Sequence, residues 1–302
     1  MPNTALLMDV KKFAVHDGPG VRTTLFLKGC PMKCIWCHNP EGIIAKAEMA
    51  YYRHKCIGCG ECIGVCPNGA HSFEGGEHRF FRERCTACGA CETACLGEAM
   101  KRFGRTIDVD EAVRIVLEDR TFYTTSNGGV TVSGGEPLLY ADFVMELFGR
   151  MREEGIHTAV DTCGCVGWEE FEKVLPVTDI FLYDVKHIDS EKHRELTGRG
   201  NERILDNLKK LSDTGTRIEI RMPLVPEHNA DDETVGRIGD FLGTLNIERM
   251  KVLPYHSLAR SKYAALGKTD TMPDVEPPTD DMLRRAVEIL RARGVNAVSG
   301  RD

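Results

Sequence analysis

The chain has 302 residues, 42% of them hydrophobic, which is enough for one large α/β core with room for a small insertion. Its formal net charge of −7 excludes the broad basic surface that binding to DNA or RNA phosphates requires. The first residues contain only a short apolar stretch without a cleavage site, and no later apolar run approaches the roughly 20 residues that span a bilayer. We therefore expect a soluble, cytoplasmic protein that binds neither nucleic acid nor membrane.

Cysteine is the most unusual part of the composition. The chain has 13 cysteines, and 11 of them lie between Cys30 and Cys95. Thiols stay reduced in the cytoplasm, so such clustering favours metal ligation over a framework of disulfides.

The predicted elements begin with a strand over residues 21–27, an apolar and β-branched run that ends at Gly29-Cys30. Residues 52–103 are then rich in cysteine and glycine, and they contain two similar units that start at Cys56 and Cys85. We interpret residues 52–103 as an inserted domain and residues 1–51 and 104–302 as the main domain.

Strands alternate with helical patterns after the insertion. Asp108 and Glu111 resemble a capping box that opens a helix. Strands are expected at 130–134, 157–161, 179–185, 217–222 and 249–255, and helices at 141–154, 202–213, 231–244 and 280–292. Such alternation predicts a parallel sheet, and six strand and helix units are two short of a closed eight-stranded barrel. The expected fold class is therefore α/β, an open, partial (β/α)6 barrel with its chemistry at the carboxyl ends of the strands.

Three cysteines follow the first strand in the spacing Cys30-x-x-x-Cys34-x-x-Cys37. A 4Fe-4S cube has four irons, so three thiolates leave one iron without a protein ligand, and an open coordination position is typical of catalytic metal sites. The alternative is a zinc or structural cluster site whose fourth ligand lies elsewhere in the sequence.

The insertion carries two longer runs of cysteines. Their spacing is that of bacterial two-cluster ferredoxins, in which the fourth cysteine of each run ligates the other cluster. The pattern predicts a ferredoxin-like domain with two 4Fe-4S clusters, one held by Cys56, Cys59, Cys62 and Cys95 and the other by Cys85, Cys88, Cys91 and Cys66. Leu96 replaces the proline expected after the second run, a change that removes no ligand.

Polar residues close the later strands. The turn Gly134-Gly135-Glu136 has little side-chain bulk, so backbone groups can approach a ligand, and the carboxylate of Glu136 can accept from an ammonium group. Asp184 and Lys186 lie on one face of a strand, where charges are costly unless they pair with each other or bind a ligand.

These motifs resemble those of radical S-adenosylmethionine enzymes. Together with the segments 16–23, 38–42 and 126–130, which read HDGPGVRT, HNPEG and SNGGV, they resemble glycyl radical enzyme activating enzymes of the type with an inserted two-cluster domain. The resemblance implies three 4Fe-4S clusters and reductive cleavage of S-adenosylmethionine to methionine and a 5′-deoxyadenosyl radical, which takes hydrogen from a backbone glycine of a partner enzyme. It also implies a monomer that receives electrons from a low-potential donor such as flavodoxin or ferredoxin.

The same resemblance assigns roles to individual residues. The cosubstrate chelates the iron that Cys30, Cys34 and Cys37 leave open. Asp17 hydrogen-bonds the partner's glycine loop, although a turn-forming aspartate before Gly-Pro-Gly explains this residue equally well. Cosubstrate contacts are assigned to Trp36, Cys37, His38, Gly134, Gly135, Glu136, Asp184, Val185, Lys186, Arg221 and His256, and a monovalent cation, sodium or potassium, to Asp161, Thr162, Leu182 and Asp184.

Two other functions share part of this pattern. A radical enzyme that acts on a small molecule or peptide has the same core, whereas an electron-transfer ferredoxin fused to a binding domain does not need the three cysteines at 30, 34 and 37. The inserted clusters are interpreted as an electron relay, with a purely structural role as the alternative. Cys163 and Cys165 have no further thiols nearby in the sequence and are expected to be free, half-buried residues.

Overall fold

The computed structural model describes residues 3–272 and 274–301, and its main feature is a nine-stranded sheet. The strand order is β13-β12-β11-β10-β9-β8-β2-β1-β7. Seven consecutive strands, β13 through β2, are parallel, and β1 and β7 add an antiparallel edge. The bounds are β1 (Thr4–Ala14), β2 (Arg22–Leu27), β7 (Arg105–Asp108), β8 (Gly129–Gly134), β9 (His157–Thr162), β10 (Ile180–Asp184), β11 (Arg217–Leu224), β12 (Arg249–Pro254) and β13 (Ala297–Ser299).

All six expected strands are present, with ends within two residues of their expected positions. The antiparallel strand β1 was not expected. Its first half, residues 4–8, is largely buried, but the stretch from Asp9 to Phe13 is mostly exposed. The sequence therefore lacks the regular alternation that identifies a strand. The sheet therefore extends beyond the predicted parallel units at one edge.

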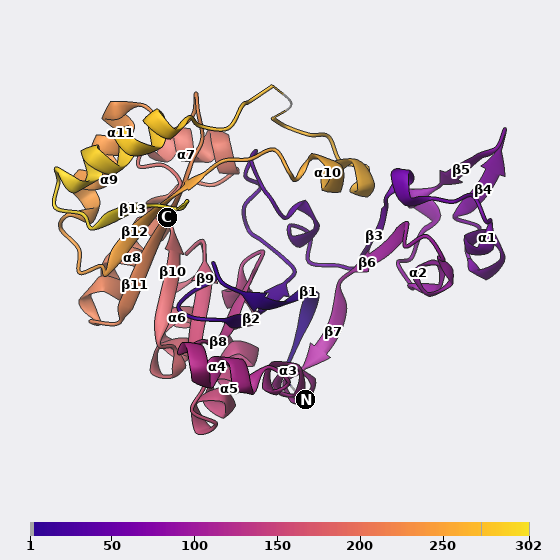
Figure 1. The fold of residues 1–302 in the computed structure, drawn as a ribbon, viewed down its shortest axis with the longest axis horizontal. Helices are drawn as coiled ribbons and strands as arrows, with labels where there is room; N and C mark the ends of the chain where they lie inside the picture. The colour runs from indigo at the N-terminus through magenta and orange to yellow at the C-terminus, as the bar shows by residue number, and fades with distance from the viewer. Residues whose placement is uncertain (1–2, 273, 302) are drawn as a thin grey trace.

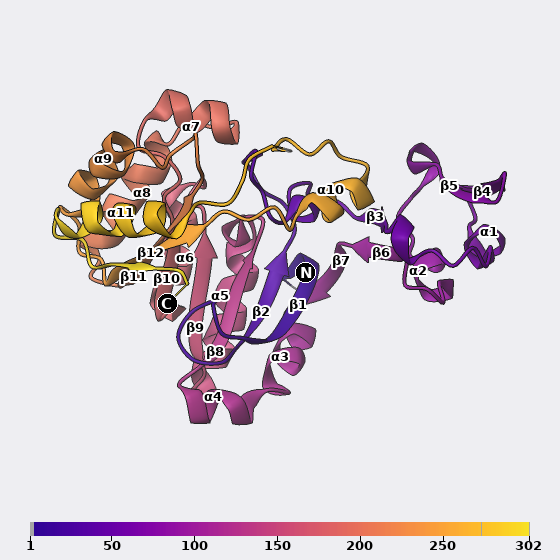
Figure 2. The same cartoon turned by 45° about the horizontal axis from the view of Figure 1, so that its top comes forward.

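Helices connect the parallel strands, and most of them pack against one face of the sheet (Figures 1 and 2), whereas α10 lies against Pro40–Gly42 and Glu48–Tyr51. Their bounds are α3 (Val109–Leu117), α4 (Arg120–Ser126), α5 (Ala141–Glu153), α6 (Trp168–Val174), α7 (Ser190–Thr197), α8 (Glu202–Asp213), α9 (Asp232–Leu242), α10 (Arg260–Leu266) and α11 (Asp280–Arg291). Short 3-10 turns lie at Pro40–Gly42, Arg53–Lys55, Arg82–Arg84, Pro137–Tyr140 and Leu175–Val177. None of the helices in the described part of the chain combines the length and apolar character needed to cross a membrane.

Half of the expected capping box is present at α3. The side chain of Asp108 accepts a hydrogen bond from the backbone N–H of Glu111 at 2.8 Å, which satisfies one of the free N–H groups at the helix start. The carboxylate of Glu111 instead pairs with Arg105 at 2.6 Å, so the reciprocal bond of a capping box is replaced by an ion pair with β7.

The two faces of the sheet differ in chemistry because side chains alternate along each strand. Apolar residues on the outer face, such as Val132, Val160 and Phe181, join the helices in the main hydrophobic core and are fully buried. Each large apolar side chain buried there contributes about 1.5–3 kcal/mol. The inner face carries Ser133 and Asp161 among other polar groups, so the functional chemistry lies on this side.

Residues 48–103 form a separate lobe at one end of the molecule, opposite α9 and α11 (Figures 1 and 2). It has two small antiparallel sheets and two short helices: β3 (Glu48–Tyr51) pairs with β6 (Met100–Phe103), β4 (His71–Glu74) pairs with β5 (Glu77–Phe80), and the helices are α1 (Glu61–Val65) and α2 (Ala90–Ala94). At the base of the lobe, the buried ammonium of Lys28 pairs with Glu48 at 2.7 Å, which ties β3 to the end of β2.

Candidate functional site

The three cysteines that follow β2 line one cavity of about 210 Å³ at the carboxyl ends of the strands. The loop brings Cys30, Cys34 and Cys37 together beside the turn after β8 and the end of β10. Of the expected cosubstrate contacts, the lining includes Trp36, Cys37, His38, Gly134, Gly135, Asp184 and Lys186. Residues that are distant in sequence thus converge on one small chamber.

Burial controls the acidity of these thiols. It raises the pKa of Cys34 to about 12 and that of Cys37 to about 11. The pKa of Cys30 is lowered, because the thiol of Cys163 donates a hydrogen bond to it and the backbone at Met32 adds a second, against the opposing effect of burial. Several buried thiols around one cavity fit a metal centre, since a bound cation favours the thiolate form that burial disfavours.

Two glycines are required where the turn after β8 meets the cysteine loop. Gly134 has φ +118°, and a Cβ there would lie 2.2 Å from the backbone oxygen of Leu27. A Cβ on Gly135 would lie 2.1 Å from the backbone oxygen of Gly29. The absence of side chains therefore lets the two loops pack backbone against backbone at the cavity wall.

Glu136 has a different position from the one its motif suggests. Its carboxylate is fully buried and accepts hydrogen bonds from Leu138 N at 3.0 Å, Cys163 N at 2.9 Å and Thr162 Oγ1 at 2.8 Å. Burial raises the pKa of this carboxyl group. The side chain holds the ends of β8 and β9 together, outside the described lining of the cavity.

Asp184 and Lys186 form an ion pair of 2.5 Å at the cavity wall, with 26% and 11% of their side-chain surface exposed. Burial alone would lower the pKa of Lys186, but Asp184 and the nearby Cys34 raise it, so the ammonium stays charged. The two groups satisfy each other and also face the chamber. Val185, between them, points away and is 1% exposed within the main core.

Two histidines stack beside the cavity. The rings of His38 and His256 have centroids 3.9 Å apart, and His38 Nε2 lies 3.0 Å from the backbone oxygen of His256. Burial, aided by His256, lowers the pKa of His38 to about 4. His256 borders a smaller neighbouring hollow with Trp36 and Cys37 and reaches the main cavity through His38.

A polar network covers the inner face below the cavity. Asp161 accepts from Ser133 Oγ at 2.7 Å and from Arg221 at 3.3 Å, and Arg221 donates to the backbone oxygen of His16 at 2.6 Å. Arg221 is thus engaged below the cavity and is absent from its described lining. Burial raises the pKa of Asp161 to about 6, although the Arg221 guanidinium opposes this shift.

The residues expected to hold a cation are only partly gathered. Asp161 and Asp184 are close enough for the charge of Asp184 to raise the pKa of Asp161. The hydroxyl of Thr162 points the other way, toward Glu136, and the side chain of Leu182 is buried. Leu182 has no polar side chain, so the two carboxylates are the members of this set that the described contacts bring together.

Asp17 lies in the loop before β2, and hydrogen bonds hold both its side chain and its backbone. Its carboxylate accepts from Thr24 Oγ1 at 2.9 Å, and its backbone oxygen accepts from Thr131 Oγ1 at 2.6 Å. The fully buried Arg22 supports the same loop through the backbone oxygen of Pro19 at 3.0 Å. The loop is therefore held rigidly against the inner face.

Cys163 is a site residue that the sequence did not identify. It is 6% exposed, lines the main cavity and lowers the pKa of Cys30, whereas it was expected to be a free, half-buried residue. Its position directly after Asp161-Thr162, at the end of a predicted strand, was the available signal. Cys165 is partly buried and packs against the main core.

The thiols of the insertion gather in crossed sets. Cys66, from the first run, borders the same cavity as Cys85, Cys88 and Cys91 from the second. Burial raises the pKa of Cys62, and the neighbouring Cys56, Cys59 and Cys95 thiols raise it further. Burial likewise raises the pKa of Cys91 to about 11, with contributions from Cys85, Cys66 and Cys88. In each set the fourth cysteine thus comes from the other run.

Three thiols beside a glycine turn at the carboxyl edge of an α/β sheet form a site that can hold an iron-sulfur cluster of an enzyme. The sequence profile of the Radical SAM superfamily matches residues 24–238. The trans-4-hydroxy-L-proline dehydratase activating enzyme of Clostridioides difficile is 39% identical over 98% of this chain and 99% of its own length. The indoleacetate decarboxylase activating enzyme of Tractidigestivibacter scatoligenes is 36% identical over 97% of this chain and 96% of its own length.

The chain therefore belongs to the radical S-adenosylmethionine superfamily and, within it, to the glycyl radical enzyme activating enzymes. Membership makes it an oxidoreductase that cleaves S-adenosylmethionine, as its motifs indicated. A solved structure supports the fold alone: Streptococcus suis SuiB bound to precursor peptide SuiA is 17% identical, covers 89% of this chain and 46% of that chain, and has a TM-score of 0.54.

Proposed function

We propose that Cys30, Cys34 and Cys37 hold the 4Fe-4S cluster at which this activating enzyme cleaves S-adenosylmethionine. The observation that carries the proposal is that the three thiols share one cavity with Gly134, Gly135 and the Asp184–Lys186 pair. When bound, the cluster supplies the electron for cleavage. The protein supplies the chamber, the charges that orient the cosubstrate and the shielding from water.

Each wall of the chamber has a distinct task in this proposal. Lys186 binds the cosubstrate carboxylate, because its ammonium stays charged, and Asp184 accepts from the ribose hydroxyls. The backbone at Gly134 and Gly135 contacts the methionyl group, which a side chain there would exclude. Glu136 positions this turn from behind through its bonds to the end of β9.

The insertion carries two further 4Fe-4S clusters in this proposal. One is held by Cys56, Cys59, Cys62 and Cys95 and the other by Cys66, Cys85, Cys88 and Cys91; the shared cavity of Cys66 with the second run supports the exchange of fourth ligands. The clusters pass electrons inward from a low-potential protein donor such as flavodoxin or ferredoxin. A structural role is the alternative.

The protein substrate is a glycyl radical enzyme whose glycine loop reaches the inner face of the sheet. Asp17 is fixed there by Thr24 and Thr131, and we assign it to the loop of the partner. A sodium or potassium ion is assigned to Asp161, Asp184 and the backbone oxygens of Thr162 and Leu182, where it offsets two neighbouring carboxylates. The protein acts as a monomer.

Iron analysis and radical detection test the proposal. We expect about 12 irons per chain after anaerobic reconstitution, and about eight when Cys30, Cys34 and Cys37 are all replaced by alanine. The intact protein, mixed with S-adenosylmethionine, a reductant and its glycyl radical enzyme partner, should give the electron paramagnetic resonance doublet of a glycine radical. The triple variant should give none. Full iron retention in that variant would contradict the assignment, and cosubstrate cleavage without any protein radical would favour a small-molecule substrate.

A further inference from the structure

The two halves of the insertion are equivalent in fold but carry different side chains beside their thiols. His71 and Met100 occupy matching positions, each five residues after the last cysteine of its run. His78 and Met49 occupy matching positions on the strands that pair with them, β5 and β3. The β4–β5 sheet therefore carries a pair of imidazoles, and the β3–β6 sheet carries a pair of thioethers at the equivalent positions.

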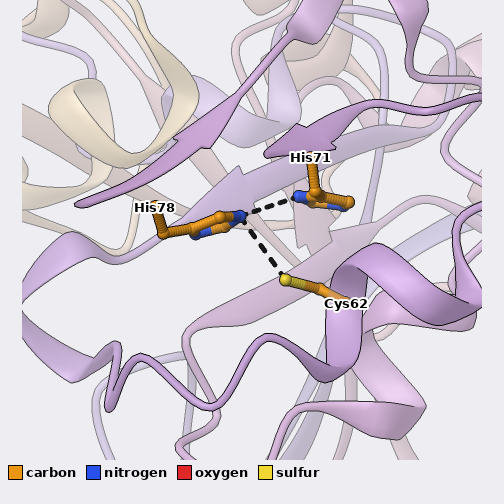
Figure 3. Close-up of side chains that lie close together, drawn as sticks. All are labelled: Cys62, His71 and His78. Carbon is orange, nitrogen blue, oxygen red and sulfur yellow. Dashed lines mark hydrogen bonds between the residues drawn. The ribbon is translucent and has the colours of Figure 1, made fainter. Parts of the chain in front are cut away.

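His78 is the member of this set that contacts thiols. Its Nε2 lies 3.4 Å from Cys62 Sγ and 3.0 Å from His71 Nδ1, as Figure 3 shows, and its Nδ1 lies 3.9 Å from Cys56 Sγ. Cys56 and Cys62 belong to the same proposed ligand set. One imidazole ring thus faces two sulfur atoms of a single cluster site.

The direction of hydrogen bonding does not depend on the tautomer. A cluster-bound thiolate has no hydrogen and only accepts, whereas a neutral imidazole carries one N–H. With the hydrogen on Nε2, the N–H of His78 is shared between Cys62 Sγ and His71 Nδ1. With the hydrogen on Nδ1, it donates toward Cys56, and Nε2 accepts from His71. Either arrangement directs the N–H at the same ligand set.

His71 holds the ring in place. It is 5% exposed, and its Nδ1 shares a hydrogen bond with His78. Its Nε2 is buried and has no hydrogen-bond partner among the described residues. His71 also borders the cavity of the second thiol set, but no hydrogen bond joins it to a thiol within the described contacts.

Among the described contacts, no side-chain N–H is hydrogen-bonded to a thiol of the second ligand set in the way that His78 contacts the first. Met49, at the equivalent position, is 4% exposed and lines the cavity of Cys66, Cys85, Cys88 and Cys91. A thioether has no hydrogen to donate. The two sites therefore differ in a feature that sets reduction potential, because a hydrogen bond to a ligand sulfur stabilises the more negative, reduced cluster.

We propose that His78 donates its ring N–H to a thiolate of the cluster held by Cys56, Cys59, Cys62 and Cys95, and thereby raises the reduction potential of that cluster above that of its neighbour. The inference rests on the two-cluster insertion proposed above. The low-potential protein donor supplies one electron, the cluster takes it up, and no bond forms or breaks, since His78 keeps its proton. His71 is a positioning residue that orients the donor ring.

The same three side chains have a second interpretation, which the test must separate. The ligand atoms of Cys62, His71 and His78 all lie within 4.8 Å of one another, an arrangement that also suits a divalent metal such as zinc. Zinc at this place requires the thiolate that the cluster uses. Zinc content and iron content therefore change in opposite directions.

The experiment uses the full chain with Cys30, Cys34 and Cys37 replaced by alanine, so that the insertion holds all the remaining iron. The key change is His78→Met, which copies the residue that the other half of the repeat already accommodates at this position. His78→Gln retains an N–H donor, and His54→Met serves as a matched control because His54 is an exposed histidine of the same lobe. Reduction potentials are measured by redox titration, in which electron paramagnetic resonance reports the reduced fraction of each cluster.

We expect His78→Met to shift one of the two potentials to a more negative value. At a fixed applied potential the ratio of reduced to oxidised cluster should fall about tenfold at that site, a shift of about 59 mV for one electron. The other potential and the content of about eight irons should not change. His78→Gln and His54→Met should stay near the parent, and Met49→His should raise the potential of the second cluster.

Several results would overturn the proposal. They are unchanged potentials in both His78→Met and Met49→His, equal shifts of both clusters in His78→Met, or one zinc per chain accompanied by loss of iron. If His78→Met fails to assemble its clusters, Met49→His still decides, because it adds a donor and removes no native hydrogen bond. Fewer than about eight irons in the parent protein would instead contradict the two-cluster insertion itself.

Discussion

The carboxylate of Glu136 accepts a hydrogen bond from the backbone N–H of Cys163 at 2.9 Å, which joins the end of β8 to the end of β9. This bond places Cys163, whose thiol lowers the pKa of Cys30, at the wall of the cavity. Glu136, in the glycine-rich turn, thus supports the cysteine loop indirectly, through Cys163. The relationship makes Glu136 a positioning residue.

Replacing Glu136 with alanine should destabilise the protein by about 1–3 kcal/mol, because it leaves buried N–H and hydroxyl groups without an acceptor. Glu136→Gln keeps one oxygen and should lose less. The free energy of unfolding is measured by urea denaturation under anaerobic conditions, together with the affinity for S-adenosylmethionine. If Glu136→Ala has the same free energy of unfolding as the wild type but binds S-adenosylmethionine more weakly, the carboxylate contacts the cosubstrate directly and the positioning role is wrong.

The parallel strands could be predicted from the sequence because each is a short run with apolar residues at consecutive or alternate positions. Val130 and Val132 lie on the outer face, and Ser133 begins the polar turn at the end of the same strand. The antiparallel edge was missed, since the exposed half of β1 has no periodic pattern. Strand pairing at an edge depends on the partner strand, which a local pattern does not contain.

The site was predictable only where spacing determines the chemistry. The spacing of the cysteine runs predicted which thiols lie near one another, and the i and i+2 spacing of Asp184 and Lys186 predicted that they pair on one face. The direction of the Glu136 side chain and the role of Cys163 depend on how β8 and β9 lie side by side. The contact of His78 with Cys62 depends on the register of a hairpin, so sequence spacing alone did not reveal it.

Lys186→Ala should keep all three clusters but weaken binding of S-adenosylmethionine roughly tenfold to a hundredfold, the loss expected for a hydrogen bond to a charged group. Lys186 lines the cavity and is no cluster ligand. His256→Ala should have a smaller effect, because His256 reaches the cavity only through its stack with His38. Calorimetric titration with the cosubstrate gives both affinities, and iron analysis controls for assembly. Unchanged affinity in both variants would place the cosubstrate elsewhere.

Asp161 should make stability depend on pH. Burial raises its pKa in the folded chain to about 6, above the ordinary value of 3.8, so between these values the folded protein holds a proton that the unfolded chain has lost. The free energy of unfolding therefore falls as pH rises through this window. The difference between wild type and Asp161→Asn, from urea denaturation at several pH values, isolates the contribution of this group.

Potassium or sodium should reduce the fall in the free energy of unfolding that the wild type shows as pH rises, because a bound cation stabilises the ionised carboxylate. The same salts should have no such effect on Asp161→Asn. The comparison uses equal ionic strength, with a large organic cation as the control salt. A difference between wild type and variant that stays constant across the window would contradict the raised pKa. An equal response of both proteins to potassium would remove Asp161 from the cation site.

The last prediction separates an electron relay from a structural role for the insertion. Cys59 and Cys88 are the exposed members of the two proposed ligand sets, so replacing one of them with alanine disturbs the packing of the lobe least. If the inserted clusters pass electrons inward, either variant should form deoxyadenosine slowly with a protein donor but nearly normally with a small, strong reductant, which reaches the Cys30 site directly. If the clusters only stabilise the lobe, their loss costs folding energy and both donors should fail together. The measurement is deoxyadenosine formation with each donor, after iron analysis has shown that the cluster at Cys30, Cys34 and Cys37 is still assembled. Equal losses with the two donors would exclude the relay.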